Sequence, residues 1–331
     1  MTTPETTLPT IADVRRAAER IAGHAVRTPL LSNPFLDERV GGRVLLKCET
    51  LQRTGAFKFR GAYNALAALG RAARERGVVA MSSGNHAQGV AEAARLFGVR
   101  ATIIMPTDAP ATKMQRTERS GGRIVTYDRA SEDRDAVAAR FIAEHGGTLI
   151  HPFNNTQVIA GQGTIGLEIA EDCAAAGIRP DAVLMPTSGG GLSAGIGLAV
   201  RDWSRDTEIV LVEPEGFDDY RRSLAAGHVV ANERSAGSVC DALLISQPGE
   251  LSFAINRAHA ASGVAVSDAE ALAAVAFAFR ELKLVVEPGG AVALAAVLSG
   301  HVEARGRALV VVLSGGNIDG PVLAEALARD D

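Results

Sequence analysis

The stretch QRTGAFKFRGA at Gln52–Ala62 carries Lys58, one of only four lysines in the chain, with a phenylalanine on either side. It follows an apolar run, VLLKC at Val44–Cys48, and precedes a helix that we expect to begin near Gly61. Apolar surroundings can lower the pKa of a lysine amine and make it available for a Schiff base. A lysine beside aromatic rings is also common at protein surfaces, where its stem packs on the rings. The stretch alone leaves both interpretations open.

Apolar runs rich in β-branched residues alternate along the chain with alanine-rich helical stretches, which is typical of βαβ units and parallel sheets. The expected strands are Val44–Cys48, Val78–Met81, Ala101–Met105, Arg123–Tyr127, Thr148–His151, Ala182–Pro186, Glu208–Pro214, Val264–Ser267 and Ala308–Ser314. An opening helix is expected from Ile11 to Gly23, with Thr10 and Asp13 at capping-box spacing. Four short strands from about Gly77 onward predict a small lobe, and the other strands a larger one. The predicted fold class is α/β with open parallel sheets flanked by helices.

Three segments that follow predicted strands are rich in glycine and serine. They are SSGNHAQG at Ser82–Gly89, TSGGGLSAG at Thr187–Gly195 and LSGGN at Leu313–Asn317. Ligands of open parallel sheets bind outside the carboxyl ends of the strands, where helix N-termini offer unpaired N–H groups. Three such segments in one chain predict a single polar ligand that is held by backbone groups from both lobes.

The second of these segments opens a helix with Ser188 and three glycines, so that backbone N–H groups can approach an anion without hindrance from Cβ atoms. Phosphate is the expected anion, and a tight turn that simply needs small residues is the other interpretation. Gly189, Gly191 and Ala194 also fit G-x-G-x-x-G/A, and Glu213 ends the next strand about 20 residues later, as in dinucleotide-binding sites. This segment therefore does not separate a nicotinamide enzyme from one that binds a monophosphate cofactor.

The composition excludes several classes of protein. The chain has 331 residues, a net charge of −4 and 47% hydrophobic residues, which is typical of a globular protein of about two domains. Its charges are spread without blocks of one sign, which argues against nucleic acid or an anionic membrane as a partner. No secretory signal and no run of about 20 apolar residues is present, so we expect a cytoplasmic protein. The three cysteines show no metal-site or disulfide spacing.

Seven segments, in this order, closely resemble motifs of the fold-type II pyridoxal-phosphate enzymes: QRTGAFKFRGA, SSGNHAQGVA, IAGQGTIGLEI, the SGGG loop, LVEPEG, VEPGGA and LSGGN. Within that group the chain is similar to the threonine/serine dehydratase and serine racemase family, from about Arg27 to Asp319. The resemblance implies a two-lobed, tryptophan synthase β-like fold, with a large cofactor-binding domain at 1–76 and 148–331 and a small domain at 77–147 that closes over the substrate. A nicotinamide dehydrogenase remains a remote alternative that leaves Lys58 unexplained, and a non-catalytic binding protein is another.

The resemblance gives Lys58 two roles, which are covalent attachment of pyridoxal phosphate and, after the substrate has displaced it, removal of the Cα proton. It also implies that Phe57 packs on the cofactor ring, that Asn85 hydrogen-bonds the 3-hydroxyl, and that Ser314 faces the pyridine nitrogen. A neutral hydroxyl there does not favour protonation of the nitrogen, which suits elimination better than transamination. The implied cofactor contacts are Phe57, Lys58, Asn85, Ser188, Gly189, Gly190, Gly191, Leu192 and Ser314.

The resemblance also implies the substrate contacts. Ser82, Asn85 and His86 would hold the α-carboxylate at a helix N-terminus. Ser83 stands where racemases and hydroxyaspartate dehydratases have serine and where threonine dehydratases have alanine. Its hydroxyl would transfer a proton on the face of Cα opposite the lysine, and capping of the following helix is the other role that the sequence allows. Arg134 corresponds to an arginine that reaches a distal acidic group on ligands of racemase-like members.

The implied reaction is that of an ammonia-lyase, or dehydratase, which converts a β-hydroxy amino acid of the L-threonine or L-serine type to a 2-oxo acid and ammonia. Serine racemase and 3-hydroxyaspartate dehydratase are the alternatives. Racemase-like relatives bind a divalent cation through residues that correspond to Glu213, the carbonyl of Phe217 and Asp219. Such oxygen ligands suit Mg²⁺ or Ca²⁺. The same resemblance leads us to expect a homodimer.

Overall fold

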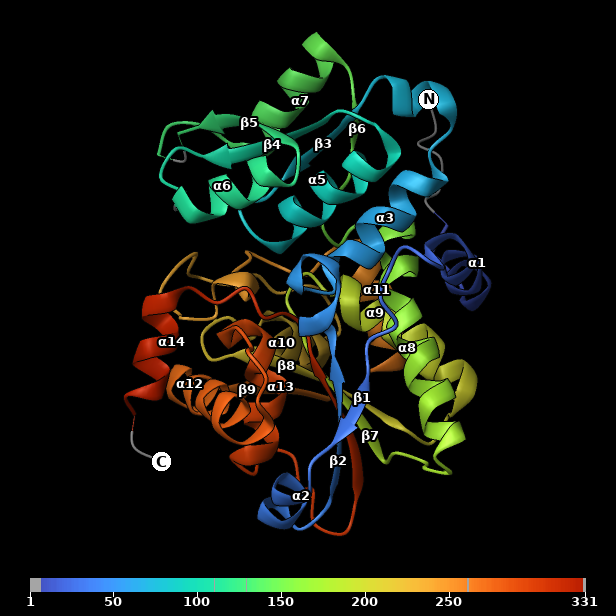
Figure 1. Cartoon of the computed structure of the whole chain (residues 1–331), viewed down its shortest axis with the longest axis vertical. Coiled ribbons are helices and arrows are strands. Elements are labelled where there is room, and N and C mark those ends of the chain that lie inside the picture. The colour runs from blue at the N-terminus through green and yellow to red at the C-terminus, as the bar shows by residue number, and fades with distance from the viewer. Residues whose placement is uncertain (1–6, 110, 129, 261, 330–331) are drawn as a thin grey trace.

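The computed structural model describes residues 7–109, 111–128, 130–260 and 262–329. It has two lobes, each built around one β-sheet, which lie one above the other in Figure 1. The small lobe has four strands in the order β5-β4-β3-β6, and the large lobe has six in the order β1-β2-β10-β7-β8-β9. The strands are β1 (Leu30–Ser32), β2 (Arg43–Cys48), β3 (Val78–Met81), β4 (Ala101–Pro106), β5 (Gly122–Tyr127), β6 (Thr148–Leu149), β7 (Ala182–Pro186), β8 (Glu208–Pro214), β9 (Ser262–Val266) and β10 (Ala308–Leu313).

Helices surround both sheets, with α5 to α7 in the small lobe and α8 to α14 in the large lobe (Figure 1). The α-helices are α1 (Ile11–Ile21), α2 (Pro34–Val40), α3 (Lys58–Ala68), α4 (Arg71–Glu75), α5 (Asn85–Phe97), α6 (Ala111–Arg119), α7 (Arg134–His145), α8 (Thr156–Ala175), α9 (Gly191–Trp203), α10 (Asp219–Ala226), α11 (Glu250–His259), α12 (Asp268–Phe277), α13 (Pro288–Leu298) and α14 (Gly320–Leu327). Four short segments are the 3₁₀ turns η1 (Glu49–Leu51), η2 (Arg53–Gly55) and η3 (Asp241–Leu243) and the π-helical turn η4 (Ala278–Leu282). The predicted cap of α1 is present, since the Asp13 carboxylate accepts the backbone N–H of Thr10 at 2.8 Å.

The strands of both sheets pair in parallel, except for β1 with β2. Every residue of β4 and β7 is buried, which is the pattern of parallel strands that helices cover on both faces. The predicted α/β class with parallel sheets is confirmed. Strand β1 was not predicted, because its three residues lie at the partly exposed edge of the sheet and form no long apolar run.

The pairing of β6 differs from the predicted division between the lobes. This strand follows the expected boundary at residue 147, yet it pairs with β3 of the small sheet, Val78 with Thr148 and Val79 with Leu149. It also ends at Leu149, two residues before the predicted end, although the N–H of Ile150 still donates to the carbonyl of Val79 at 2.8 Å. The small sheet therefore extends to residue 149, whereas the division into domains at 1–76 with 148–331 and at 77–147 remains a prediction.

Helices α3 and α8 pack with no side chain between them at their closest point. A Cβ atom on Gly161 would lie 2.6 Å from the Cα atom of Gly61, so a larger residue would force the helices apart. Gln162 of α8 accepts the backbone N–H of Gly61 at 3.1 Å. Gly163 makes a similarly close contact with α9. The glycines of the IAGQGTIGLEI segment are thus required by helix packing, which holds α3 and its Lys58 against the large lobe.

The cysteines and the helices bear on the remaining sequence predictions. Cys48, Cys173 and Cys240 are buried free thiols, and burial raises the pKa of each. A buried thiol with a raised pKa is a poor nucleophile, so none of the three is suited to a reactive role. Within the described part of the chain, no helix has the length and apolar character needed to cross a membrane.

Candidate active site

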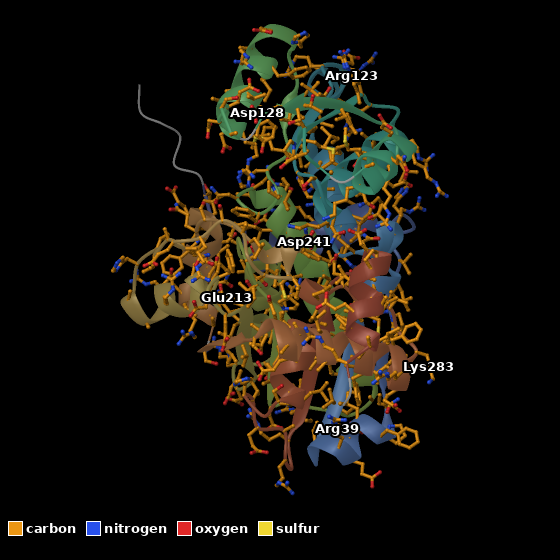
Figure 2. All side chains as sticks on the ribbon, turned by 90° about the vertical axis from the view of Figure 1, so that its left-hand side faces the viewer. Arg39, Arg123, Asp128, Glu213, Asp241 and Lys283 are labelled. Carbon is orange, nitrogen blue, oxygen red and sulfur yellow. The ribbon has the colours of Figure 1, made fainter. Side chains whose placement is uncertain are left out.

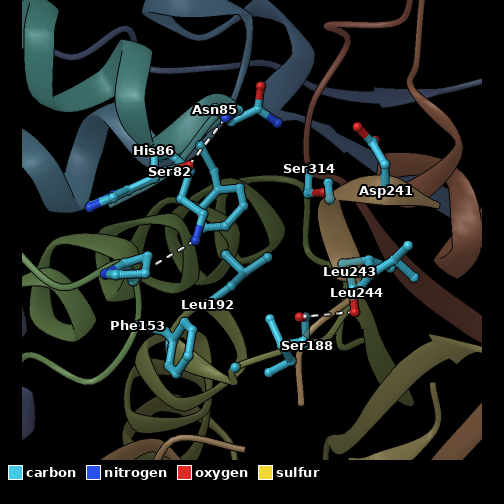
Figure 3. A pocket seen from close by; sticks show the side chains of 18 of the residues that line it. Ser82, Asn85, His86, Phe153, Ser188, Leu192, Asp241, Leu243, Leu244 and Ser314 are labelled. Carbon is cyan, nitrogen blue, oxygen red and sulfur yellow. Dashed lines mark hydrogen bonds between the residues drawn. The ribbon is translucent and has the colours of Figure 1, made fainter. Parts of the chain in front are cut away.

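A cavity of about 250 Å³ lies between the two lobes, at the carboxyl ends of strands β3, β7 and β10. The three segments rich in glycine and serine all contribute to its wall. In Figure 3, Ser82, Asn85 and His86 lie on the small-lobe side, and Ser188 and Leu192 on the large-lobe side. The fold therefore brings segments more than 200 residues apart in the sequence to one site, as the sequence predicted for a single ligand.

Lys58 is the first residue of α3, three residues before the predicted start of the helix. Its Nζ atom donates a hydrogen bond to the carbonyl oxygen of Pro152 at 3.1 Å and lies 5.0 Å from the centre of the Phe57 ring. Enclosure in the cavity lowers the pKa of the Lys58 amine to about 8. An amine with this pKa is neutral often enough near neutral pH to act as a nucleophile or a base.

Both polar atoms of the Asn85 side-chain amide form hydrogen bonds. Its Nδ2 donates to Glu287 Oε1 at 2.6 Å, and its Oδ1 accepts from Asn317 Nδ2 at 2.8 Å. One Nδ2 hydrogen remains to point elsewhere, because an amide nitrogen carries two. Burial raises the pKa of Glu287 to about 7. Sequence analysis gave no role to Glu287 or Asn317, and the only signal for them was their membership of the segments VEPGGA and LSGGN.

The glycines of the loop between β7 and α9 are required by what lies behind them. A Cβ atom on Gly189 would lie 2.2 Å from the ring of Phe153, and one on Gly190 would lie 1.8 Å from the hydroxyl of Tyr220. Gly190 also has a φ of +86°, which other residues rarely adopt. Helix α9 begins at Gly191, so its first N–H groups lack partners within the helix and favour an anion in the cavity.

Two serines and Phe57 complete the large-lobe wall. The hydroxyl of Ser188 donates to the carbonyl of Leu243 at 3.1 Å, so it would have to rotate to donate to a ligand in the cavity (Figure 3). Ser314 follows β10 and lines the cavity, and its carbonyl accepts the backbone N–H of Phe57 at 3.0 Å. Leu192 is buried in the same wall. All the residues predicted to contact a cofactor therefore lie around this cavity.

The small-lobe wall is the N-terminus of α5. Ser82 and Ser83 precede the helix and line the cavity, and the Ser82 hydroxyl accepts the N–H of Gly84 at 3.2 Å. The side chain of His86 turns away, because its Nε2 donates to the carbonyl of Ile150 at 2.7 Å. Burial lowers the pKa of His86 to about 3, so the ring is neutral. The backbone N–H group, and not the side chain, is therefore the part of His86 that is suited to hold an anion.

Three cationic side chains of the small lobe line the outer part of the cavity: Lys113 and Arg116 of α6 and Arg134, the first residue of α7. Sequence analysis proposed only Arg134, because nothing in the sequence distinguished Lys113 or Arg116 from surface residues. Lys113 forms an ion pair with Asp241 of the large lobe. Figure 2 labels Asp241, which lies at the level where the two lobes meet. This pair joins the two lobes at the mouth of the cavity.

The predicted cation ligands lie together in the large lobe, outside the cavity. Glu213 is the residue before the last of β8 and accepts the N–H groups of Tyr220 and Arg221 at 2.9 and 2.8 Å. Asp219 Oδ1 accepts from Asn232 Nδ2 at 2.7 Å. Burial and the proximity of Asp219 raise the pKa of Glu213, and burial raises that of Asp219 to about 6. Across the residues that the structure describes, no group of three or more His, Cys, Asp and Glu side chains forms a metal site.

Comparison with known proteins gives the family. A model of the pyridoxal-phosphate dependent enzymes matches residues 21–315. The chain belongs to this family. It is 43% identical to an L-threo-3-hydroxyaspartate ammonia-lyase of Pseudomonas sp, over 93% of this chain and 95% of the relative.

Two further relatives of this pyridoxal-phosphate enzyme are named for other reactions or substrates. The chain is 39% identical to an L-threonine ammonia-lyase of Thermotoga maritima, over 94% of this chain and 76% of the relative. The solved structure of maize serine racemase superposes with a TM-score of 0.91 at 36% identity, covering 97% of both chains. The resemblance drawn from the sequence motifs is confirmed, and the names of these relatives agree with the predicted class of reaction.

The residues present fit pyridoxal phosphate. Lys58 supplies a buried amine with a lowered pKa, the Asn85 amide has a hydrogen free for the 3-oxygen, and the helix N-terminus at Gly191 suits a phosphate. A lysine, a ring pocket and an anion site in one cavity are the three features that the cofactor needs. The dinucleotide interpretation of the glycine loop would leave the first two unused.

We predict that borohydride treatment of the purified enzyme leaves a pyridoxyl group on Lys58. The reason is that Lys58 is the lysine with its amine enclosed in the cavity, and mass spectrometry of peptides can separate it from the other three lysines. Lys58→Arg should prevent labelling, whereas Lys283→Arg, at an exposed site of the large lobe, should be labelled like the wild type. A label on Lys47, Lys113 or Lys283 would overturn the assignment.

Proposed function

We propose that the protein is an ammonia-lyase that converts a β-hydroxy amino acid to a 2-oxo acid and ammonia. The observation that carries the proposal is the amine of Lys58, with its lowered pKa, in a cavity that two helix N-termini also line. The relatives named as ammonia-lyases support the same reaction. When bound, pyridoxal phosphate supplies the electron sink that stabilises negative charge at the substrate's Cα.

Different residues of the cavity would bind the cofactor and the substrate. Phe57, Asn85 and Ser314 would hold the cofactor ring, and residues 188–192 would hold its phosphate. The substrate carboxylate would bind at the N-terminus of α5, to the N–H groups of Asn85 and His86 and to the Ser82 hydroxyl. These contacts fix the carboxylate, so that the Cα–H bond can be directed at the amine.

Lys58 would take the Cα proton, since its pKa of about 8 lies close to neutral pH. The β-hydroxyl then leaves, with one proton, as a water molecule. The released enamine reacts with water to give the 2-oxo acid and ammonia. The overall change requires no oxidant or reductant, because the carbon that loses nitrogen gains oxygen while the β-carbon loses it.

Among β-hydroxy amino acids, the charged outer wall favours a substrate with a second carboxylate. Lys113, Arg116 and Arg134 all line the cavity from the small lobe. Serine and threonine carry no group that could pair with these cations, whereas 3-hydroxyaspartate does. Two relatives named L-threo-3-hydroxyaspartate ammonia-lyases, at 43% and 40% identity, support this choice of substrate over threonine.

Replacing a cation of the outer wall should change substrate preference. Arg134→Gln should lower kcat/KM for L-threo-3-hydroxyaspartate at least tenfold, about 1.4 kcal/mol, and leave kcat/KM for L-threonine within about twofold. Arg140→Gln is the matched control, because Arg140 lies on the same helix but pairs with Glu132 outside the cavity. The measurement is ammonia release from both substrates. An equal loss with both substrates would contradict a role in recognising the second carboxylate.

Racemisation is a second candidate activity, because Ser83 lines the same cavity as Lys58. Racemisation of an amino acid needs a proton donor on each face of Cα, and a single lysine serves only one face. A hydroxyl at Ser83 would supply the second. The relatives named serine racemases support this possibility.

Ser83→Ala separates elimination from racemisation. The variant should lose interconversion of L- and D-serine, and should keep elimination from the L-substrate within about tenfold of the wild type. Lys58→Ala should lose both reactions, because both need the amine. Chiral chromatography and 2-oxo acid release measure the two rates. If Ser83→Ala loses L-elimination as completely as Lys58→Ala, the hydroxyl instead holds the substrate or the loop.

We also propose that the chain binds Mg²⁺ or Ca²⁺ through Glu213, Asp219 and the carbonyl of Phe217. Asp219 Oδ2 is buried and has no hydrogen-bond partner among the described residues, so it is available to a cation. Burial and the proximity of Asp219 raise the pKa of Glu213, so the two carboxylates repel each other when both are ionised. A divalent cation between them would remove that repulsion, and carboxylate and carbonyl oxygens are its preferred ligands.

Cation binding should stabilise the fold, since a ligand that binds only the folded state raises the free energy of unfolding. Mg²⁺ or Ca²⁺ at 100 times its Kd should add about 2.7 kcal/mol and raise Tm by several degrees. Asp219→Asn should abolish the response. Glu215→Gln should keep it, because Glu215 is an exposed neighbour outside the ligand set. The site would be refuted by a Tm that the cation leaves unchanged in the wild type, as measured by calorimetry.

The expected cytoplasmic homodimer belongs to the same proposal. Phe35 of α2 and Phe279 of η4 are 65% and 41% exposed, which is unusual for phenylalanine in a monomer. Phe35 and Arg39 line a shallow hollow together with residues of α12 and η4. A second copy of the chain is the partner that the resemblance implies, and this hollow, lined by both phenylalanine and charged side chains, offers it a surface on the large lobe away from the cavity.

A further inference from the structure

Tyr220 lies between the proposed cation site and the glycine loop of the cavity. It follows Asp219 in the first turn of α10, and its side chain is fully buried. Its backbone N–H donates to Glu213 at the proposed cation site, and its hydroxyl reaches the loop at residues 189–190. No role was given to this residue by the sequence motifs, although it stands directly after the proposed ligand Asp219.

On the cation side, the first turn of α10 is tied to the carboxylates. Glu213 accepts the N–H of Tyr220 at 2.9 Å, and Asp219 is its neighbour in the chain. Asp219 is fully buried, and its Oδ2 lacks a partner among the described residues. A cation held by both carboxylates would therefore fix the backbone on each side of the Tyr220 N–H group, and with it the direction in which the tyrosine side chain leaves the helix.

On the loop side, the tyrosine hydroxyl touches the backbone that faces the cofactor phosphate. It donates a long hydrogen bond to the carbonyl of Gly189 at 3.5 Å, and a Cβ atom on Gly190 would lie only 1.8 Å from it. Asn256 supports the same loop, since its Nδ2 donates to the carbonyl of Gly190 at 3.2 Å. The loop therefore rests on Tyr220 with no side chain of its own in between, and a shift of the ring would move the loop.

We propose that Tyr220 couples the two sites, so that a cation held by Glu213 and Asp219 strengthens the binding of pyridoxal phosphate by the glycine loop. The inference rests on the proposed function, which supplies both ligands. Coupling between two ligands is reciprocal, so the cofactor must raise the affinity for the cation by the same factor. Tyr220 is a positioning residue in this scheme, because it touches the loop and not the reacting atoms.

The test is the rate at which the holoenzyme releases pyridoxal phosphate, followed by cofactor fluorescence after dilution into Mg²⁺ or into a chelator. Mg²⁺ should slow release from the wild type about fivefold or more, the lower end of typical coupling. In Tyr220→Phe, which removes only the hydroxyl, Mg²⁺ should still raise Tm but should no longer slow release. Tyr127→Phe, a buried tyrosine of the small lobe, is the matched control and should respond like the wild type.

A second measurement needs no change at Tyr220. The chain has three tyrosines, so holoenzyme labelled with fluorotyrosine gives three ¹⁹F signals, which Tyr63→Phe and Tyr127→Phe assign. Mg²⁺ should shift the Tyr220 signal in the wild type and leave it in place in Asp219→Asn. A Tm that rises with Mg²⁺ while the release rate and the Tyr220 signal stay unchanged would overturn the coupling alone. A Tm that does not respond at all would overturn the cation site and the coupling together.

Discussion

The buried guanidinium of Arg60 fixes helix α3, and with it the position of Lys58 two residues earlier. Its side chain is fully buried and donates to Glu49 at 2.8 and 2.9 Å and to Glu168 of α8 at 2.6 and 2.9 Å. Lys47 of β2 also donates to Glu168 at 2.6 Å. Two cations and two carboxylates therefore balance one another inside the large lobe. Removing one member of such a buried set costs about 3–5 kcal/mol, because the remaining charges stay unpaired.

This ion network and the glycine packing of α3 on α8 act on the same few residues. Gly61, next to Arg60, is the point where α8 approaches closest, and a side chain there would collide with Gln162. The ion pairs of Arg60 fix the position of α3, and the glycines determine how closely α8 can approach it. Helix α3 also packs into the core of the small lobe, where Phe59 and Tyr63 lie in one cluster with residues of α5. Lys58 thus stands at the start of a helix that contacts α8 of the large lobe and α5 of the small lobe.

The sequence predicted the elements that depend on neighbouring residues along the chain. It did not predict the features that depend on contacts with residues far away in the chain. Strands Val78–Met81 and Ala182–Pro186 have the predicted bounds, because apolar runs between turns suffice to define buried parallel strands. The start of α3 was misplaced, since Gly61 is typical of a helix boundary but is here an interior residue required by α8. Glu287 and Lys113 escaped notice because their partners lie 202 and 128 residues away. Local sequence contains no trace of such pairs.

Burial in the cavity opposes charge on its titratable side chains. Burial shifts the pKa of Lys58 to about 8, of His86 to about 3 and of Glu287 to about 7, each towards its uncharged form. The N-termini of α5 and α9, which also line the cavity, add a positive potential that does not change with pH, because it comes from backbone N–H groups. Lys113, Arg116 and Arg134 add cationic side chains on the small-lobe side of the cavity. In the proposed reaction, this arrangement would leave the backbone to bind the anionic groups that all β-hydroxy amino acids share, and the cationic side chains of the small lobe to recognise a group that distinguishes one substrate from another.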